Sequence, residues 1–197
     1  MESTNSTFSF SINLIILVLT LSLTIGIFRE NGKWNLQRGK KAFRYFTLQS
    51  NLLCAGASLC MCVFPDERWA YNLKLVGTAG VTVTMLTVLL FLSRIYGIGS
   101  LLKGSELFMH LITPLMAIAS LCLFERRGIS FGTAFLGMLP VALYAPLYLY
   151  KTLHAPENKR WEDFYGFNIG GRWKIAYVMM HLGAALICLA LYFVLNF

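Results

Sequence analysis

The chain has 197 residues, of which 57% are hydrophobic and only 13% are charged, and its formal net charge is +8. This composition argues against a soluble domain and predicts an integral membrane protein. Most Lys and Arg residues lie beside apolar stretches, where membrane topology explains them, so no nucleic-acid partner is expected.

Six apolar stretches are each about 20 residues long, which is enough to cross the ~30 Å hydrocarbon core of a bilayer. The loops between them are too short to fold as separate domains. The sequence therefore predicts an all-α integral membrane protein, with one bundle of six transmembrane helices over residues 1–197. The predicted spans are Phe8 to Phe28, Tyr45 to Phe64, Leu75 to Ser93, Leu107 to Phe124, Ile129 to Tyr150 and Ile175 to Phe197.

Basic residues predict the orientation of this bundle. Loops one, three and five together carry 13 Lys and Arg residues, whereas the termini with loops two and four carry 4, namely Arg68, Lys74, Arg126 and Arg127. Because cytoplasmic loops are enriched in Lys and Arg, loops one, three and five are predicted to be cytoplasmic and both termini to lie outside. The expected location is a membrane, the cell membrane if the source is bacterial.

Polar side chains interrupt the start of the second span. In the segment RGKKAFRYFTLQSN, the residues Thr47, Gln49, Ser50 and Asn51 lie just inside the apolar region. Buried polar groups are costly in lipid unless they have partners. We therefore expect this cluster to have a structural or chemical role.

His110 lies at a comparable depth in the fourth span. Thr47 follows Arg44 by three residues and His110 follows Glu106 by four, so at ~1.5 Å per residue both lie ~5 Å inside the same face. An ionisable side chain in the membrane is a candidate functional residue. The predicted spans contain no Asp, Glu, Lys or Arg, and their only other histidine is His181.

Thr47 and His110 are the pair that can act as a nucleophile and its general base. A threonine hydroxyl becomes nucleophilic when a neighbour takes its proton, and a neutral imidazole can do so. His110 is expected in the first turn of its helix, where the helix dipole favours the uncharged form. Gln49, Ser50 and Asn51 are candidates for hydrogen bonds to an oxyanion. On spacing alone, Thr47 bonded to its own backbone and His110 as a packed histidine remain the alternative.

Proline and glycine shape the second half of the chain. Pro114, four residues after His110, cannot donate to the His110 carbonyl, so the helix is expected to bend there. Pro140 and Pro146 should kink or unwind the fifth span. Loop five, APENKRWEDFYGFNIGGRW, is suited to cover a cavity or to serve as an interfacial linker, and its Tyr165 and Asn168 are candidate oxyanion or substrate contacts.

The motifs FRYFTLQSNLL and MHLITPLMAI, followed by a fifth span rich in Pro and Tyr, resemble the androgen-induced membrane protein family and its bacterial relatives. The resemblance runs from about Phe43 to the C-terminus. It implies a multi-pass hydrolase that cleaves fatty-acid esters of hydroxy fatty acids with an intramembrane threonine and histidine, at the positions of Thr47 and His110. The chain departs from the family at Tyr165-Gly166-Phe167-Asn168, which lacks the family's proline and acidic residue.

The leading hypothesis is a membrane-embedded threonine hydrolase of long-chain lipid esters that works through an acyl-enzyme, with no cofactor and no metal expected. Its expected partners are the lipid bilayer and a long-chain acyl ester substrate. The alternatives are a small-molecule transporter or passive pore, and a non-catalytic membrane scaffold. Transport is disfavoured because the predicted spans lack acidic and basic residues and the halves of the chain show no repeat.

Overall fold

The computed structural model describes residues 2–197, with side chains from residue 5 onward. Six of its helical stretches are long and apolar enough to cross a membrane, which confirms the predicted all-α, six-helix class. These stretches are Asn5–Ile27, Phe46–Val63, Arg68–Tyr96, Ser105–Phe124, Phe131–His154 and Trp173–Asn196. The chain is thus a multi-pass membrane protein.

The stretches are built from α-helices with shorter π-helical and 3-10 segments. The first three stretches and their connections comprise α1 (Glu2–Ile27), β1 (Arg29–Glu30), β2 (Lys33–Trp34), α2 (Leu36–Ala42), α3 (Phe46–Val63), α4 (Arg68–Thr87), the π-helix η1 (Val88–Leu92), α5 (Ser93–Tyr96) and α6 (Ile98–Leu101). The fourth stretch comprises α7 (Ser105–Leu107), the π-helix η2 (Phe108–Ile112), α8 (Thr113–Ala119) and the π-helix η3 (Ser120–Phe124). The remainder comprises α9 (Phe131–Ala134), the 3-10 helix η4 (Phe135–Met138), α10 (Leu139–Leu149), the π-helix η5 (Tyr150–His154), the 3-10 helices η6 (Glu157–Lys159) and η7 (Ile169–Gly171), and α11 (Trp173–Asn196).

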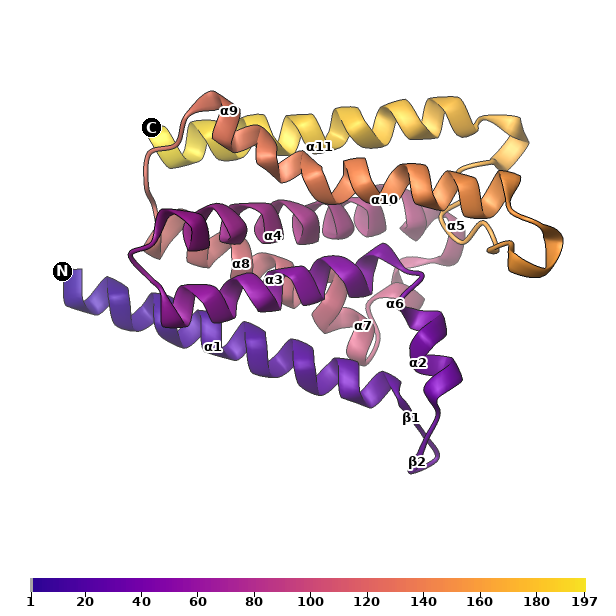
Figure 1. Cartoon of the computed structure of the whole chain (residues 1–197), viewed down its shortest axis with the longest axis horizontal. Coiled ribbons are helices and arrows are strands. Elements are labelled where there is room, and N and C mark those ends of the chain that lie inside the picture. Colours follow the sequence, from indigo (N-terminus) through magenta and orange to yellow (C-terminus); the bar gives the residue numbers. More distant parts are fainter. Residues whose placement is uncertain (1) are drawn as a thin grey trace.

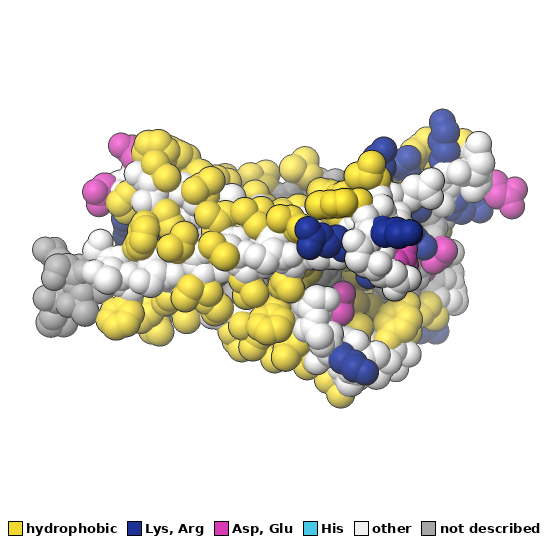
Figure 2. Space-filling model, turned by 90° about the horizontal axis from the view of Figure 1, so that it is seen from below, with side chains coloured by type: hydrophobic (Ala, Val, Ile, Leu, Met, Phe, Trp, Pro, Cys, Tyr) yellow, Lys and Arg dark blue, Asp and Glu magenta, His cyan; other side chains and the backbone are white. Residues whose placement is uncertain are grey.

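The six long helices run side by side in alternating directions (Figure 1). Both termini lie at one end of the bundle, and the connections after α1, α5 and η5 lie at the other end. Hydrophobic side chains cover the middle of the face seen in Figure 2, while Lys and Arg gather mainly toward one end. The end that holds loops one, three and five is called the loop end below.

The third stretch, with α4 at its start, is the centre of the bundle. Two thirds of its most apolar window (67%) is buried, compared with 22% for the first and last stretches. Helix α4 packs against α3, α8, η4 and α11. Its glycines permit close approach, because a Cβ on Gly77 would lie only 2.9 Å from the Cα of Cys54 in α3.

One expectation about the spans is wrong. Helix α4 begins at Arg68, seven residues before the predicted start of the third span, so Lys74 lies inside the helix and is fully buried. Its ammonium donates to Asn13 Oδ1 at 2.6 Å and to Ser58 Oγ at 3.2 Å. Glu125, at the end of the fourth stretch, is also buried, and its Oε1 accepts from Asn13, Ser9 and Ser120. The prediction failed because these polar partners allow a charge within an apolar bundle.

Pro114 has the expected local effect through a π-helical segment. In η2 the backbone N–H of Thr113 bonds to the carbonyl of Phe108, five residues earlier. The wider turn accommodates Pro114, which cannot donate to the carbonyl of His110. The fifth stretch contains the 3-10 segment η4 directly before Pro140 and the π-helical segment η5 after Pro146. Both segments depart from regular α geometry, as expected around these prolines.

Loop one contains a short β-hairpin. Asn31 and Gly32 form its two-residue turn with φ of 51° and 78°, and Glu30 pairs with Lys33. Asn-Gly suits a turn that needs two positive φ angles. Asn35 then caps α2 by accepting from the N–H of Arg38, and the chain enters α3 at Phe46. This arrangement places the start of α3 at the loop end of the bundle.

Candidate functional site

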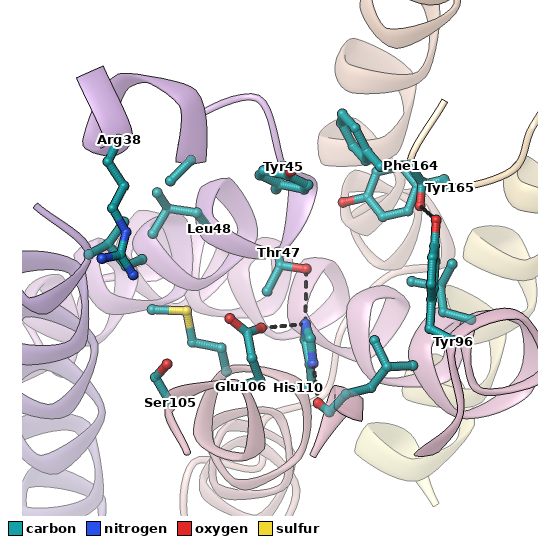
Figure 3. A pocket seen from close by; sticks show the side chains of 15 residues that line it. Arg38, Tyr45, Thr47, Leu48, Tyr96, Ser105, Glu106, His110, Phe164 and Tyr165 are labelled. Atoms are coloured by element: carbon teal, nitrogen blue, oxygen red, sulfur yellow. Dashed lines mark hydrogen bonds and ion pairs between the residues drawn. The ribbon is translucent and has the colours of Figure 1, made fainter. Parts of the chain in front are cut away.

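A cavity of about 460 Å³ lies at the loop end of the bundle (Figure 3). It is bounded by the start of α3, the segment from α7 to η2, loop three and loop five. Its lining combines apolar side chains with a few polar ones, namely Arg38, Tyr45, Thr47, Tyr96, Ser105, Glu106, His110 and Tyr165. Concave sites that are mostly apolar with a few convergent polar groups are typical of small-molecule binding.

Thr47 and His110 meet in this cavity from different helices. Thr47 is the second residue of α3, His110 is the third residue of η2, and Thr47 Oγ1 lies 3.4 Å from His110 Nε2 (Figure 3). The predicted proximity of the two side chains is confirmed. A separation of this size is common between a nucleophile and its base before substrate binds.

The other ring nitrogen of His110 fixes its orientation. Nδ1 lies 2.7 Å from the carbonyl oxygen of Leu101 in loop three. A carbonyl only accepts, so Nδ1 carries the proton and Nε2 of the neutral ring has a free lone pair toward Thr47. His110 is buried, at 6% exposed, and the carbonyl of Leu101 sets its tautomer.

Glu106 is the charged partner of His110. Its Oε2 lies 3.2 Å from His110 Nε2, one helical turn away, and its side chain is half exposed. A carboxylate stabilises an imidazolium at this distance but gives a neutral Nε2 no proton to share. Glu106 therefore pairs with the protonated form of His110.

Asn51 links the helical segments that carry Thr47 and His110. Its Nδ2 donates to the carbonyl of Thr47 at 2.8 Å and to the carbonyl of Met109 at 3.0 Å. Both N–H bonds of this fully buried amide are therefore used between α3 and η2. Asn51 holds the helices of Thr47 and His110 together, and it has no proton left to donate to an oxyanion.

Three other predicted site residues lie outside the cavity. Gln49 is partly buried and donates to the carbonyl of Phe43, while Ser50 bonds to Thr84 Oγ1 at 2.8 Å and donates to the Thr47 carbonyl. Asn168 is exposed on loop five, and its backbone N–H donates to Asp163. None of the three is brought to Thr47 as an oxyanion donor in this structure.

Tyr165 does reach the pair. Its hydroxyl accepts a hydrogen bond from the backbone N–H of Phe46 at 2.8 Å and also lies close to the hydroxyl and the N–H of Thr47. Burial raises the pKa of Tyr165 to about 12. The hydroxyl thus keeps its proton near neutral pH and can donate it beside Thr47.

The N-terminus of α3 adds positive potential at the same place. Tyr45 is its N-cap, and its side chain makes no capping bond. The first N–H groups of a helix have no partner within the helix, and its dipole favours negative charge there. Thr47 therefore occupies a position that favours an alkoxide or an oxyanion.

Loop five covers the cavity with Phe164 and Tyr165. Asp163 organises this segment, since its Oδ1 accepts from the N–H of Phe167 at 2.9 Å and from the hydroxyl of Tyr148 at 2.8 Å. Asp163 therefore fixes the path of the chain from Tyr148 to Phe167. Gly166, at φ +66°, closes the turn in a conformation that suits glycine.

Sequence reasoning missed the Leu101 carbonyl and the contacts of Glu106. No side-chain pattern identifies a backbone carbonyl, but Glu106 is four residues before His110 on the same helix, a spacing that brings two side chains together. His110 also lies further from its helix start than expected, because the helical stretch begins at Ser105. The expected influence of the helix N-terminus on His110 is therefore weaker than the contact with Leu101.

His181 makes its contacts outside the cavity. It lies in α11, its Nδ1 bonds to the carbonyl of Tyr177 at 2.9 Å, and its ring packs on that of Tyr177. It does not line the cavity. Among the described residues, no three His, Cys, Asp or Glu side chains gather in an arrangement suited to a metal ion.

Comparisons of the chain with models of protein families, with curated proteins and with solved structures found no match.

Proposed function

We propose that this protein is a membrane-embedded hydrolase of long-chain lipid esters, with Thr47 as the nucleophile and His110 as the general base. The observation that carries the proposal is the 3.4 Å approach of Thr47 Oγ1 to His110 Nε2, in a ring whose Nδ1 is held by the Leu101 carbonyl. The arrangement of nucleophile, base and orienting acceptor is the one that acyl transfer requires. The resemblance of the Thr47 and His110 motifs to a hydrolase family supports the same assignment.

In the first half of the reaction, Thr47 Oγ1 attacks the ester carbonyl carbon while its proton passes to His110 Nε2. The negative charge that forms on the carbonyl oxygen is stabilised by the Tyr165 hydroxyl and by the N-terminus of α3. Glu106 stabilises the imidazolium. Collapse of the intermediate breaks the ester C–O bond, and His110 returns the proton to the leaving alkoxide, which departs as an alcohol.

In the second half, water attacks the acyl-Thr47 ester. His110 takes a proton from this water, and the new tetrahedral intermediate breaks its bond to Thr47 Oγ1. The proton on Nε2 then returns to Thr47, and the products are a fatty acid and the free enzyme. No redox step or external proton donor is needed for this sequence.

The buried network around Lys74 favours a second candidate, a small-molecule transporter. Ionisable side chains within membrane helices often line ion or proton pathways. Lys74 and Glu125 lie near the end of the bundle opposite Thr47 and His110, and they are linked through Asn13. A transporter would require this network and would not require the hydroxyl of Thr47.

Substitution of the pair tests the proposal. Thr47→Ala and His110→Ala should each lower kcat for a long-chain ester in proteoliposomes at least about 100-fold. The double variant should be hardly worse than either single one, because residues that act as a unit are not additive. Thr47→Ser should keep part of the activity, and His181→Ala should keep all of it.

Chemical labelling provides an independent readout. A fluorophosphonate probe should modify Thr47 in the wild type and should fail to modify it in His110→Ala. Full hydrolysis by Thr47→Ala, or labelling only at another residue, would refute the assignment of the nucleophile.

A further inference from the structure

A second, almost wholly apolar cavity of about 380 Å³ opens between α4, η1 and α11. On one side it is lined by Val83, Leu86, Thr87, Leu90 and Phe91, and on the other by residues of α11 from Met179 to Ala190. Leu90 and Phe91 are half exposed, as are Leu182 and Leu186, although all are apolar. These side chains lie within a membrane-spanning part of the bundle, so the cavity, called the α4/α11 groove below, is open to lipid.

One small cavity, called the junction below, lies between Thr47 and the α4/α11 groove. This cavity of about 20 Å³ shares Thr47, Leu92 and Tyr165 with the loop-end cavity. The same small cavity shares Val83, Thr87 and Met180 with the α4/α11 groove. Thr47 therefore lines two spaces, the loop-end cavity and the small cavity that borders the α4/α11 groove.

The junction must widen to admit an alkyl chain. A cavity of this size holds about one water molecule, so an alkyl chain requires side chains to move. Met180 is half buried at the junction, and its unbranched thioether side chain adapts readily to a new neighbour. Thr87, the last α-helical residue before η1, borders the opposite wall, next to a π-helical segment of the kind that often marks functional sites.

We infer that the α4/α11 groove binds the acyl chain of the ester that Thr47 attacks, while the alcohol portion occupies the loop-end cavity. This inference rests on the proposed function and adds the determinant of acyl-chain length. The lined part of α11, from Met179 to Ala190, extends ~16 Å at 1.5 Å per residue and forms the central part of this spanning helix. A long acyl chain gains apolar contact along this length, whereas a short acyl chain ends before the junction.

Gly183 offers a direct test, since it lies in the wall of the groove and a Cβ there would meet nothing within 4 Å. Gly183→Leu should fill the groove without disturbing the packed bundle. Gly56→Leu is the matched control, because Gly56 is also inside a spanning helix, has nothing within 4 Å of a Cβ, and lines none of these cavities.

The first measurement compares p-nitrophenyl palmitate with p-nitrophenyl butyrate. Gly183→Leu should lower kcat/KM for the palmitate ester roughly 10-fold to 100-fold, as expected when several methylenes lose their subsite. It should leave kcat/KM for the butyrate ester within about twofold of the wild type, and Gly56→Leu should leave kcat/KM for both esters unchanged. Equal loss on both esters in Gly183→Leu would overturn the inference.

The second measurement does not depend on hydrolysis. Photoactivatable palmitic acid with a diazirine near its methyl end should crosslink to groove residues such as Met179 and Leu186, and Gly183→Leu should lower this labelling severalfold relative to Gly56→Leu. Labelling spread over all lipid-facing helices and unaffected by Gly183→Leu would overturn the inference. Groove labelling in a protein that hydrolyses neither ester would instead refute the proposed function and leave the acyl site standing.

Discussion

At the scale of single residues, most hydrogen-bond donors beside Thr47 already have acceptors within the protein. Asn51 has both amide protons committed to the carbonyls of Thr47 and Met109, and Ser50 donates to the Thr47 carbonyl. The polar residues beside Thr47 in sequence therefore hold the backbone of α3 in place. The proposed donor for an oxyanion is Tyr165, which is more than 100 residues away in sequence and whose hydroxyl lies at the start of α3.

Substitution of Tyr165 by Phe tests this donor. Removal of one oxyanion donor commonly lowers kcat by a factor on the order of 100 to 1,000, so Tyr165→Phe should lower kcat for a long-chain ester about 100-fold with little change in KM. Steady-state kinetics in proteoliposomes measure both constants. An unchanged kcat would remove Tyr165 from the mechanism.

The pKa of Tyr165 also predicts how the stability of Tyr165→Phe should depend on pH. Because burial raises this pKa to about 12 in the folded protein, the unfolded chain loses the proton first as pH rises above the ordinary value of 10. The neutral hydroxyl contributes fully to stability below pH 10, and its contribution declines between pH 10 and 12, by at most about 2 kcal/mol. The free energy of unfolding in detergent should therefore fall less across this interval in Tyr165→Phe than in the wild type. An equal fall in both proteins would contradict the raised pKa.

At the scale of elements, the sequence predicts each helix but not the polar contacts between helices. Runs of apolar residues identify all six spans, because length and hydropathy decide whether a helix can cross a bilayer. The same runs misplace the start of the third span. Lys74 is tolerated there because Asn13 from α1 and Ser58 from α3 accept hydrogen bonds from its ammonium group. The depths of Thr47 and His110 follow from the rise of a helix, whereas the Leu101 carbonyl depends on the path of a loop. Contacts of this kind have no local sequence signal.

Helix α1 shows how such contacts hold a peripheral element. Its buried positions Asn13, Ile16, Thr20 and Thr24 recur every three or four residues and so form one face, and three of the four are polar. Asn13 accepts from Lys74 and donates to Glu125. In lipid, apolar burial gives little drive for association, so polar contacts and close packing hold helices together. The network of Lys74, Asn13 and Glu125 should therefore be a main attachment of α1.

Substitution of Lys74 tests this attachment. Lys74→Met leaves the buried Asn13 Oδ1 and Ser58 Oγ without their charged donor, and leaves Glu125, which Asn13 links to Lys74, as an unpaired charge of the network. Hydrogen bonds to charged groups commonly contribute about 1.5 to 3 kcal/mol, so thermal stability in detergent should fall. Lys74→Met with Glu125→Gln should recover part of the loss, because the second change removes the unpaired charge. Lys103→Met, on an exposed loop residue, should stay within about 0.5 kcal/mol of the wild type. A Lys74→Met protein as stable as the wild type would show that the network does not anchor α1.

At the scale of the whole molecule, the distribution of basic residues acquires a clearer meaning once the helices are placed. Lys74 is buried within α4 and does not belong to a loop, so only Arg68, Arg126 and Arg127 remain at the end that holds the termini. There Arg127 donates to the carbonyls of Pro65 and Asp66, which ties loops two and four together. The basic residues of loops one, three and five belong to the loop end, and one of them, Arg38, lines the cavity of the candidate site. The charge asymmetry between the two ends is therefore larger than the sequence count implies.

This asymmetry predicts that the loop end faces the cytoplasm and that both termini face outside. In a bacterial host, a C-terminal green fluorescent protein should stay dark, and a C-terminal alkaline phosphatase should be active. An epitope inserted between Asn31 and Gly32, at the exposed tip of the β1–β2 hairpin, should resist protease added to intact spheroplasts and become cleavable when the membrane is opened. If the C-terminal green fluorescent protein is fluorescent and the hairpin epitope is cleaved in intact spheroplasts, the orientation is the opposite of the predicted one. The proposed Thr47 chemistry would then face the outside of the cell, because Thr47, His110 and the hairpin share the loop end whichever way the bundle is inserted.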